Sequence, residues 1–224
     1  MPNQVIITAG GLGQRTGQKL PKQFHTLAGI PVLAHSINTF SYSLPGAPIS
    51  VTLPREWQDY WQKESQKIEG LPSFNLVDAG ESRFDSIKNA LASIEDDSGY
   101  VWIHDAARPM VSHELIHSIE SQLGGTSKGF IPAISMRDSL RKWEDQQWKP
   151  VKRENFCLIQ TPQVFPLKQL KIAYQQAYNE TFSDDATVYE STGYEIELIQ
   201  GEEKNLKITY SIDLAIAESL LRKA

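Results

Sequence analysis

The 224-residue sequence predicts a doubly wound α/β fold built on a mostly parallel β-sheet. The first indication is a set of short, continuous apolar runs such as 5–9 and 100–104, which are typical of strands buried on both faces. The second is the regular alternation of these runs with segments of helical periodicity. Strands that alternate with helices along the chain form a sheet with helices on both of its faces.

In the first half of the chain, each expected strand is followed by a helix. The strands are apolar runs at residues 5–9, 49–53, 74–77 and 100–104. The helices carry an apolar face and are expected at residues 31–40, 57–68, 83–94 and 112–123. Ser112 suits the N-cap of the last helix, because its side chain can accept a hydrogen bond from the first turn.

The second half of the chain continues this pattern with one interruption. Further strands are expected at residues 129–134, 156–159, 195–199 and 206–209. Helices are expected at residues 167–178, from about 183, and from 212. There is no internal repeat, low-complexity tract or linker, so we expect one domain over residues 1–224.

The interruption is a β-hairpin, for which we expect an arm at about residues 138–154. Two β-rich runs, 140–143 and 148–151, flank a polar tip, and each run contains a Trp. With no helix above it, such a hairpin would be poorly buried within one subunit. We therefore interpret it as an arm that packs on a partner subunit in a homodimer. The alternative is an exposed hairpin packed on its own domain.

Composition narrows the classes of function. Hydrophobic residues make up 40% and charged residues 22%, which is ordinary for a globular protein. The formal net charge of -5 argues against a general nucleic-acid binder. Cys157 is the only cysteine, which excludes an intramolecular disulfide and a cysteine zinc site. Neither a signal peptide nor a membrane span is evident, so a cytoplasmic location is expected.

The loop 8–15 is the first candidate binding element. It follows a strand, where open α/β sheets bind ligands, and its glycines let backbone N–H groups approach a polyphosphate. Arg15 and Lys22 add positive charge nearby. The loop matches neither G-x-G-x-x-G nor G-x-x-x-x-G-K-[ST], so a plain tight turn remains the alternative. No acidic residue lies between Arg15 and Pro54, which excludes an NAD-dependent oxidoreductase.

Asp105 and Arg108 form the second candidate element, at the end of an apolar strand. A carboxylate in that position can hold Mg²⁺ that bridges triphosphate oxygens. A guanidinium three residues further on can bind a second phosphate in bidentate fashion. The alternative is an internal Asp–Arg ion pair that fixes a loop.

Several other polar residues have ordinary structural interpretations when each is taken alone. Asp184 and Asp185 suit the first turn of a helix and need no catalytic role. His104 lies beside Asp105, but no G-x-S-x-G nucleophile accompanies it, so we interpret it as structural. The other members of this group are Arg153, Thr161, Ser183 and Lys207.

Eight motifs occur in order and without large gaps between residues 4 and 222. They are AGGLGQR (9–15), PKQF (21–24), PVLAHS (31–36), GESRFDS (80–86), HDAARP (104–109), QTPQ (160–163), SDDA (183–186) and NLKIT (205–209). Any one of them is weak, but in this order the set resembles the 2-C-methyl-D-erythritol 4-phosphate cytidylyltransferase family.

The resemblance implies a Rossmann-like sheet and a β-arm that exchanges contacts in a homodimer. It implies an Mg²⁺-dependent enzyme that condenses CTP with 2-C-methyl-D-erythritol 4-phosphate. The products would be 4-diphosphocytidyl-2-C-methyl-D-erythritol and pyrophosphate, in the non-mevalonate route to isoprenoid precursors. The implied partners are thus CTP, a sugar-alcohol phosphate and a second copy of the chain, with no nucleic acid and no membrane.

The resemblance also implies roles for individual residues. Similarity to the family assigns cytosine and ribose binding to Ala9, Gly10, Gly11, Gly80, Glu81 and Ser86. Arg15 and Lys22 are expected to act on the triphosphate, Lys207 is expected to help at the α-phosphate, and Asp105 is expected to hold Mg²⁺. The second-substrate site is expected to contain Arg108, Ser139, Arg153, Thr161 and Ser183, with Ser139 and Arg153 reaching over from the neighbouring subunit.

Three positions depart from the pattern expected of the family. Ser139 and Ser183 stand where Thr is frequent, and each keeps a hydroxyl that can bind phosphate. Gly10 stands where Ala is frequent, and an Ala-Gly-Gly opening is also common in ribitol 5-phosphate cytidylyltransferases. That activity is one alternative, and a non-catalytic nucleotide-sensing module is another. The Ala106-Ala107 pair and the SDDA motif look more like the methylerythritol enzyme.

Overall fold

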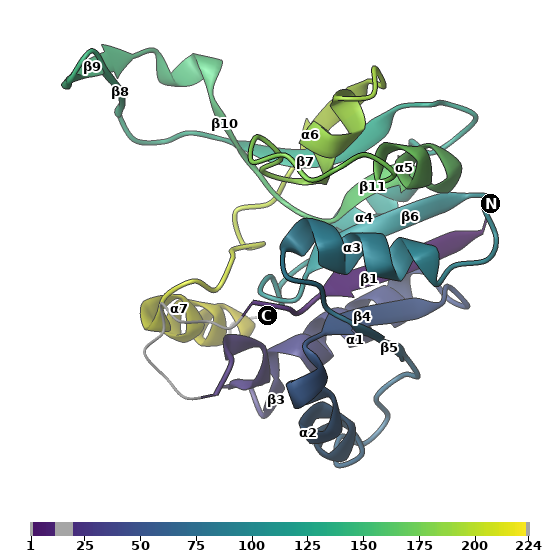
Figure 1. Ribbon diagram of the computed structural model, residues 1–224. Coiled ribbons are helices and arrows are strands. Elements are labelled where there is room, and N and C mark those ends of the chain that lie inside the picture. Colours follow the sequence, from purple (N-terminus) through teal and green to yellow (C-terminus); the bar gives the residue numbers. More distant parts are fainter. Residues whose placement is uncertain (1, 12–19, 223–224) are drawn as a thin grey trace.

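The computed structural model describes residues 2–11 and 20–222, and an eight-stranded mixed sheet runs through its centre (Figure 1). Seven strands follow the order β10-β7-β11-β6-β1-β4-β5, and the eighth, β12, pairs with β7. Their bounds are β1 Asn3–Thr8, β4 Ile49–Leu53, β5 Asn75–Asp78, β6 Tyr100–Asp105, β7 Gly129–Ser135, β10 Cys157–Ile159, β11 Gln163–Pro166 and β12 Ile196–Gln200.

Most strand pairs in this sheet are parallel, as the sequence predicts. β1 pairs in parallel with β4 and β6, β4 with β5, and β7 with β12. The antiparallel pairs are those of β11 with β6 and β7, and of β10 with β7. The parallel strands β1 and β6 end side by side, with Thr8 opposite Asp105, so polar residues that follow them meet at one edge.

Helices cover both faces of the sheet and divide the core in two. Alternate residues of β1 point to opposite faces, with Val5 and Ile7 in one hydrophobic cluster and Ile6 in the other. The first cluster contains residues of α1 (Val32–Ser43), α2 (Arg55–Ser65) and α4 (His113–Glu120). The second contains residues of α3 (Arg83–Ala92), α5 (Leu167–Ala173) and α6 (Asp185–Glu190). The doubly wound prediction is therefore confirmed.

Some boundaries differ from the sequence predictions. The side chain of Ser112 accepts a hydrogen bond from the backbone of Leu115, so the predicted cap of α4 is confirmed. The helix expected from about residue 183 is α6, which begins at Asp185; its N-cap is Asp184, whose carboxylate accepts the backbone N–H of Thr187. The helix predicted at 167–178 ends at Ala173, and the last helix, α7, spans Ser211–Leu221.

Two strand predictions were wrong or incomplete. No strand forms at residues 206–209; this segment crosses the end of the sheet, and the backbone N–H of Ile208 bonds to the carbonyl of Ala107. β11 was not predicted, although its four residues are all buried between β6 and β7. A small ladder of β2 (Thr26–Leu27) with β3 (Ile30–Pro31), preceded by the 3-10 helix η2 (Lys22–Phe24), was also missed.

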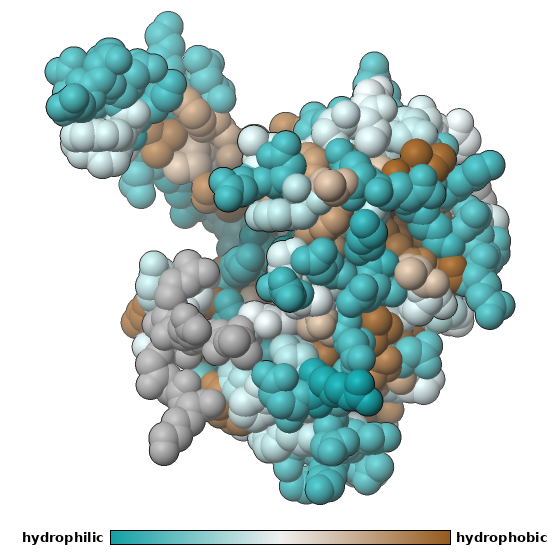
Figure 2. All heavy atoms as spheres, viewed as in Figure 1, coloured by the Kyte–Doolittle hydropathy of each residue, from teal (hydrophilic) through white to brown (hydrophobic). Residues whose placement is uncertain are grey.

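The predicted hairpin is present and projects from the body of the molecule. β8 (Leu140–Glu144) pairs with β9 (Gln147–Val151) and with no other strand of the described chain, and the 3-10 helix η3 (Arg153–Asn155) leads from it into β10. Figures 1 and 2 show it standing away from the sheet and its helices. Among the described residues, no helix is long and apolar enough to cross a bilayer.

Candidate active site

A cleft of about 540 Å³ opens at the carboxyl ends of β1 and β6. This volume is in the range of small-molecule sites in proteins. The cleft brings together eight of the residues singled out in the sequence, namely Gly10, Gly11, Lys22, Gly80, Glu81, Ser86, Asp105 and Lys207. The sequence analysis gave no role to its other lining residues, which are Thr8, Ser82, Arg83, Ala107 and Thr209.

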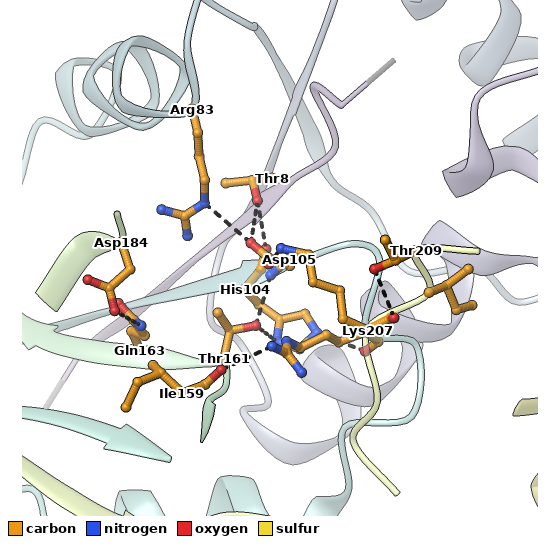
Figure 3. Close-up of polar contacts among 12 residues, drawn as sticks. Thr8, Arg83, His104, Asp105, Ile159, Thr161, Gln163, Asp184, Lys207 and Thr209 are labelled. Atoms are coloured by element: carbon orange, nitrogen blue, oxygen red, sulfur yellow. Dashed lines mark hydrogen bonds and ion pairs between the residues drawn. The ribbon is translucent and has the colours of Figure 1, made fainter. Parts of the chain in front are cut away.

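Asp105 is the most constrained residue of the cleft (Figure 3). Its Oδ2 lies 2.6 Å from Nζ of Lys207, and its Oδ1 lies 3.3 Å from Nε of Arg83. The hydroxyl of Thr8 donates to Oδ1 over 3.2 Å, and the backbone N–H of Asp105 donates to Oγ1 of Thr161 over 3.0 Å. The carboxylate is thus held from two sides by cations that reach it from α3 and from the segment after β12.

This arrangement keeps Asp105 ionised. Burial alone would raise the pKa of its carboxyl, but the positive charges of Arg83 and Lys207 outweigh burial and hold the pKa well below its usual range. An anionic carboxylate at the floor of the cleft is a suitable oxygen ligand for a hard cation such as Mg²⁺. Among the described residues, no group of three or more His, Cys, Asp or Glu side chains is arranged to hold a metal ion. A metal bound by Asp105 would therefore take its other oxygens from a bound substrate and from water.

The segment that carries Lys207 is pinned across the end of the sheet. Gln160 holds its first part, because Oε1 accepts the backbone N–H of Glu202 and Nε2 donates to the carbonyls of Glu202 and Asn205. Further along, Nζ of Lys22 donates to the carbonyl of Ile208 over 2.8 Å. Lys22 and Lys207 therefore approach the cleft from sequence-distant segments that are tied together.

The opposite wall of the cleft is formed by the loop that enters α3. The backbone N–H of Gly80 donates to Oγ of Ser86, and that hydroxyl donates to the carbonyl of Ser82. Ser82 and Asp85 form a capping box that fixes the first turn of α3. A Cβ on Gly80 would lie 2.3 Å from Cβ of Asp85, so the loop can close this tightly only with glycine. Gly10 lies next to this loop, since a Cβ on it would be 3.4 Å from Cβ of Ala79 and 3.6 Å from Oγ of Ser86, and it lines the cleft together with Gly11.

Comparison with known proteins identifies the family. The sequence model described as "IspD: 2-C-methyl-D-erythritol 4-phosphate cytidylyltransferase" matches residues 4–223. The chain belongs to this family. The 2-C-methyl-D-erythritol 4-phosphate cytidylyltransferase of Bacteroides thetaiotaomicron is 39% identical over 221 residues, which cover 99% of this chain and 100% of that protein. That of Porphyromonas gingivalis is 38% identical over 217 residues, covering 96% of each chain.

Solved structures agree with this membership. The crystal structure of 2-C-methyl-D-erythritol 4-phosphate cytidylyltransferase from Francisella tularensis has a TM-score of 0.80 and 28% identity, covering 98% of this chain and 99% of that one. The enzyme from Thermus thermophilus has a TM-score of 0.73 and 27% identity, covering 97% and 98%. The predicted family and fold class are confirmed, and the chain is an enzyme, a nucleotidyltransferase. The ribitol and sensor alternatives lose their support.

Three residues with family-implied roles lie beside the cleft rather than in its lining. Arg108 donates from Nη1 to the carbonyl of Asn205 and from Nη2 to that of Ile159, so it forms no direct ion pair with Asp105. Thr161 is buried behind Asp105 and holds its backbone. Ala9 is also buried, and its carbonyl accepts a hydrogen bond from Gln23.

The remaining implied residues lie farther away or outside the described chain. Ser139 and Arg153 are exposed at the base of the hairpin, where Nη1 of Arg153 donates to the carbonyl of Arg137. Ser183 is exposed beside a hollow of about 80 Å³ next to Arg83. Arg15 lies outside the described residues.

His104 is enclosed directly behind Asp105. Its Nε2 lies 3.0 Å from the carbonyl of Arg108, and its Nδ1 lies 3.1 Å from Oγ1 of Thr161. Burial, which outweighs the opposing hydrogen bond to Arg108, lowers the pKa of this imidazole to about 4. The ring is therefore neutral near pH 7, with its proton on Nε2 and Nδ1 accepting from Thr161.

Acidification should destabilise the protein through His104. Between its ordinary pKa of 6.5 and its folded pKa of about 4, the unfolded chain binds a proton that the folded chain does not. The contribution of neutral His104 to the free energy of unfolding is thus complete above about pH 6.5. It decreases as the pH drops towards 4, by on the order of 3 kcal/mol. Urea unfolding across this range should show a shallower pH slope for His104→Gln than for the parent. Equal slopes would contradict the assignment.

Proposed function

We propose that this cleft is where the chain condenses CTP with 2-C-methyl-D-erythritol 4-phosphate, releasing pyrophosphate. As a member of its family, the chain is a cytidylyltransferase of the non-mevalonate route to isoprenoid precursors. The observation that carries the proposal is the convergence of Lys22, Lys207 and Arg83 around the single carboxylate of Asp105. Such a site can hold two phosphorylated molecules next to each other.

The glycine-lined side of the cleft suits the nucleoside. Gly10, Gly11, Gly80 and Glu81 line it together with Ser86. Backbone groups without a Cβ can approach a base and a ribose closely, and the carboxylate of Glu81 can accept from sugar hydroxyls. Ala9 supports this wall from behind through its bond to Gln23. We assign cytosine and ribose binding to this side.

The cationic side suits the triphosphate and its metal. Arg15 and Lys22 would bind the triphosphate, and Asp105 would hold Mg²⁺ together with triphosphate oxygens, as Mg²⁺ is commonly bound by one carboxylate and substrate phosphates. Lys207 now occupies Oδ2 of Asp105, but its side chain is 45% exposed and can turn towards a phosphate. Bound Mg²⁺ would supply neutralisation of the charge that develops on the triphosphate.

The chemistry needs positioning more than proton transfer. A phosphate oxygen of the sugar-alcohol phosphate attacks the α-phosphorus of CTP, the bond to the bridging oxygen breaks, and pyrophosphate leaves. The nucleophile is already an anion, so no general base is required. Lys22 and Lys207 stabilise the negative charge of the transition state, since both reach the cleft from segments that are tied together.

The second substrate would be held by two subunits. Arg108 and Thr161 lie next to Asp105, and Ser183 lies beside the hollow next to Arg83. Ser139 and Arg153 belong to the base of the hairpin. The hairpin carries Trp143 and Trp148, which are 55% and 60% exposed with their rings 5.2 Å apart.

Phe156, just before β10, and Leu158, within it, are also exposed apolar residues. A homodimer in which the arm, residues 138–154, covers the partner's cleft would bury this surface and bring Arg153 to the substrate phosphate.

The remaining proposals concern the whole chain. Residues 1–224 would form a single nucleotidyltransferase domain from which the arm projects. The enzyme would act in the cytoplasm on small molecules, without nucleic-acid or membrane partners, which agrees with its net charge of -5 and its single cysteine.

The decisive functional experiment is pyrophosphate release from CTP and Mg²⁺ with each of two acceptors. The proposal expects release with 2-C-methyl-D-erythritol 4-phosphate and little with ribitol 5-phosphate, because the polyol pocket distinguishes hydroxyl patterns. Faster release with ribitol 5-phosphate would assign the other substrate, and no release with either would overturn the proposal.

Lys22→Ala should lower kcat by about 100-fold or more while raising the KM for CTP much less, since the lost charge acts mainly in the transition state. Steady-state pyrophosphate release measures both constants. Lys67→Ala is the matched control, because Lys67 is exposed and pairs with Glu64 on the surface. Near-normal turnover of the Lys22 variant would refute the role of Lys22.

Arg153→Ala should raise the KM for the sugar-alcohol phosphate about tenfold, as expected for a lost charged hydrogen bond, and spare CTP. Arg141→Ala in the same hairpin is the control. A mixed dimer of Arg153→Ala and Lys22→Ala subunits tests the action between subunits. If the arm acts in trans, one of the two sites contains both residues and activity returns. No recovery in the mixed dimer would contradict the model.

A further inference from the structure

Asp185 is a buried charge that the proposed reaction leaves unexplained. It is the first residue of α6, with no exposed surface, and does not line the cleft. Its two carboxylate oxygens accept Nη1 and Nη2 of Arg83 over 3.0 and 2.6 Å, and the hydroxyl of Tyr174 donates to Oδ1. Burying a carboxylate costs free energy, so Asp185 is stable in this position only because Arg83 and Tyr174 satisfy its oxygens.

The guanidinium of Arg83 joins two carboxylates at once. Its two terminal nitrogens are taken by Asp185, and this leaves Nε directed at Oδ1 of Asp105 over 3.3 Å. A planar guanidinium that is bound through both Nη1 and Nη2 to one carboxylate cannot rotate, and this fixes the direction in which its Nε–H donates. The orientation of the Asp105 carboxylate therefore depends on Asp185, although Asp185 does not touch it.

The far end of this bridge is anchored to the same sheet as Asp105. Gln163 on β11 donates from Nε2 to Asp184 over 2.8 Å, and its Oε1 accepts the backbone N–H of Ala186 over 3.0 Å. β11 pairs directly with β6, the strand that ends in Asp105. The two carboxylates are thus positioned by neighbouring strands, and Arg83 binds both of them. Figure 3 shows the contact of Arg83 with Asp105, and Gln163 beside Asp184.

We propose that Asp185 is a positioning residue, which acts through Arg83 to hold the Asp105 carboxylate in the orientation that binds the nucleotide's metal. The inference rests on the proposed function, in which Asp105 carries Mg²⁺. Residues that orient a metal ligand from behind change metal affinity by about 10- to 100-fold when they are altered. Asp185 should follow this rule, because its carboxylate binds both Nη1 and Nη2 of Arg83 and so sets the orientation of the guanidinium.

The test measures CTP binding by calorimetry without a second substrate, so that no turnover occurs. Each protein is titrated with CTP in the absence and in the presence of Mg²⁺, and the ratio of the two affinities gives the gain due to the metal. Asp185→Asn, which keeps the shape of the side chain, should reduce this gain by about tenfold or more. Its affinity for CTP without Mg²⁺ should match the parent.

Two reference variants show the largest and the smallest effect expected on the gain from Mg²⁺. Asp105→Asn should abolish the gain from Mg²⁺. Asp78→Asn should leave it unchanged, because the side chain of Asp78 is 57% exposed and its ion pair with Arg55, at 3.9 Å, lies on the surface. If Asp185→Asn does not fold, Tyr174→Phe removes only one donor from Asp185 and should reduce the gain by a smaller factor.

The outcomes separate the two proposals. A folded Asp185→Asn protein that loses stability but keeps the parent's gain from Mg²⁺ would overturn the positioning role and leave the proposed function intact. If Tyr174→Phe has to be used instead, an unchanged gain in CTP affinity from Mg²⁺ would likewise overturn the positioning role of Asp185. A parent that shows no gain from Mg²⁺ would overturn both, since Asp105 would then not be a metal carboxylate.

Discussion

The ion cluster at Asp105 is the interaction on which the rest of the site depends. One carboxylate with a side chain only 11% exposed is paired with Lys207 at 2.6 Å and with Arg83 at 3.3 Å. Removing charges from water is costly, so the cluster is stable only if each member is held in place by its surroundings. The hydrogen bonds of Thr8, Thr161 and Asp185 provide this support. The result is a cleft in which the carboxylate of Asp105 is held in place before a substrate arrives.

The fold assembles this cluster from segments that are far apart in the sequence. β1 and β6 end side by side, which sets Thr8 against Asp105. Arg83 reaches them from the first turn of α3, and Lys207 from the segment that crosses the sheet after β12. Two glutamines of the QTPQ motif hold the segments that carry the charged residues. Gln160 holds the segment that leads to Lys207, and Gln163 holds the start of α6, which carries Asp185. Preorganised charge of this kind is a main source of catalysis in phosphoryl and nucleotidyl transfer.

Local sequence patterns predicted most of the fold, because a strand buried on both faces and an amphipathic helix can each be identified from residues that are close in the sequence. β11 was missed because its four residues form a strand only through pairing with β6 and β7. Residues 206–209 alternate like a strand, yet they cross the end of the sheet, where Gln160 and Ala107 hold their segment. Such tertiary partners are invisible to a local pattern.

The cleft was predicted better than its supports. Motifs at the ends of strands singled out Gly10 and Asp105, and the structure places both in one cleft together with Lys22, since strand ends meet at one edge. Asp185 resembled an ordinary carboxylate of a first helical turn, and its partner Arg83 lies 102 residues away. Both residues do lie inside recognised motifs, 80–86 and 183–186, and that was the only signal for a joint role.

A crystal structure of the chain with CTP and Mg²⁺ tests the central claim most directly. The account predicts the metal on the carboxylate of Asp105, the triphosphate beside Lys22, and the ammonium of Lys207 turned from Oδ2 towards a phosphate. A triphosphate bound elsewhere, with Asp105 still paired to both cations and bearing no metal, would contradict it.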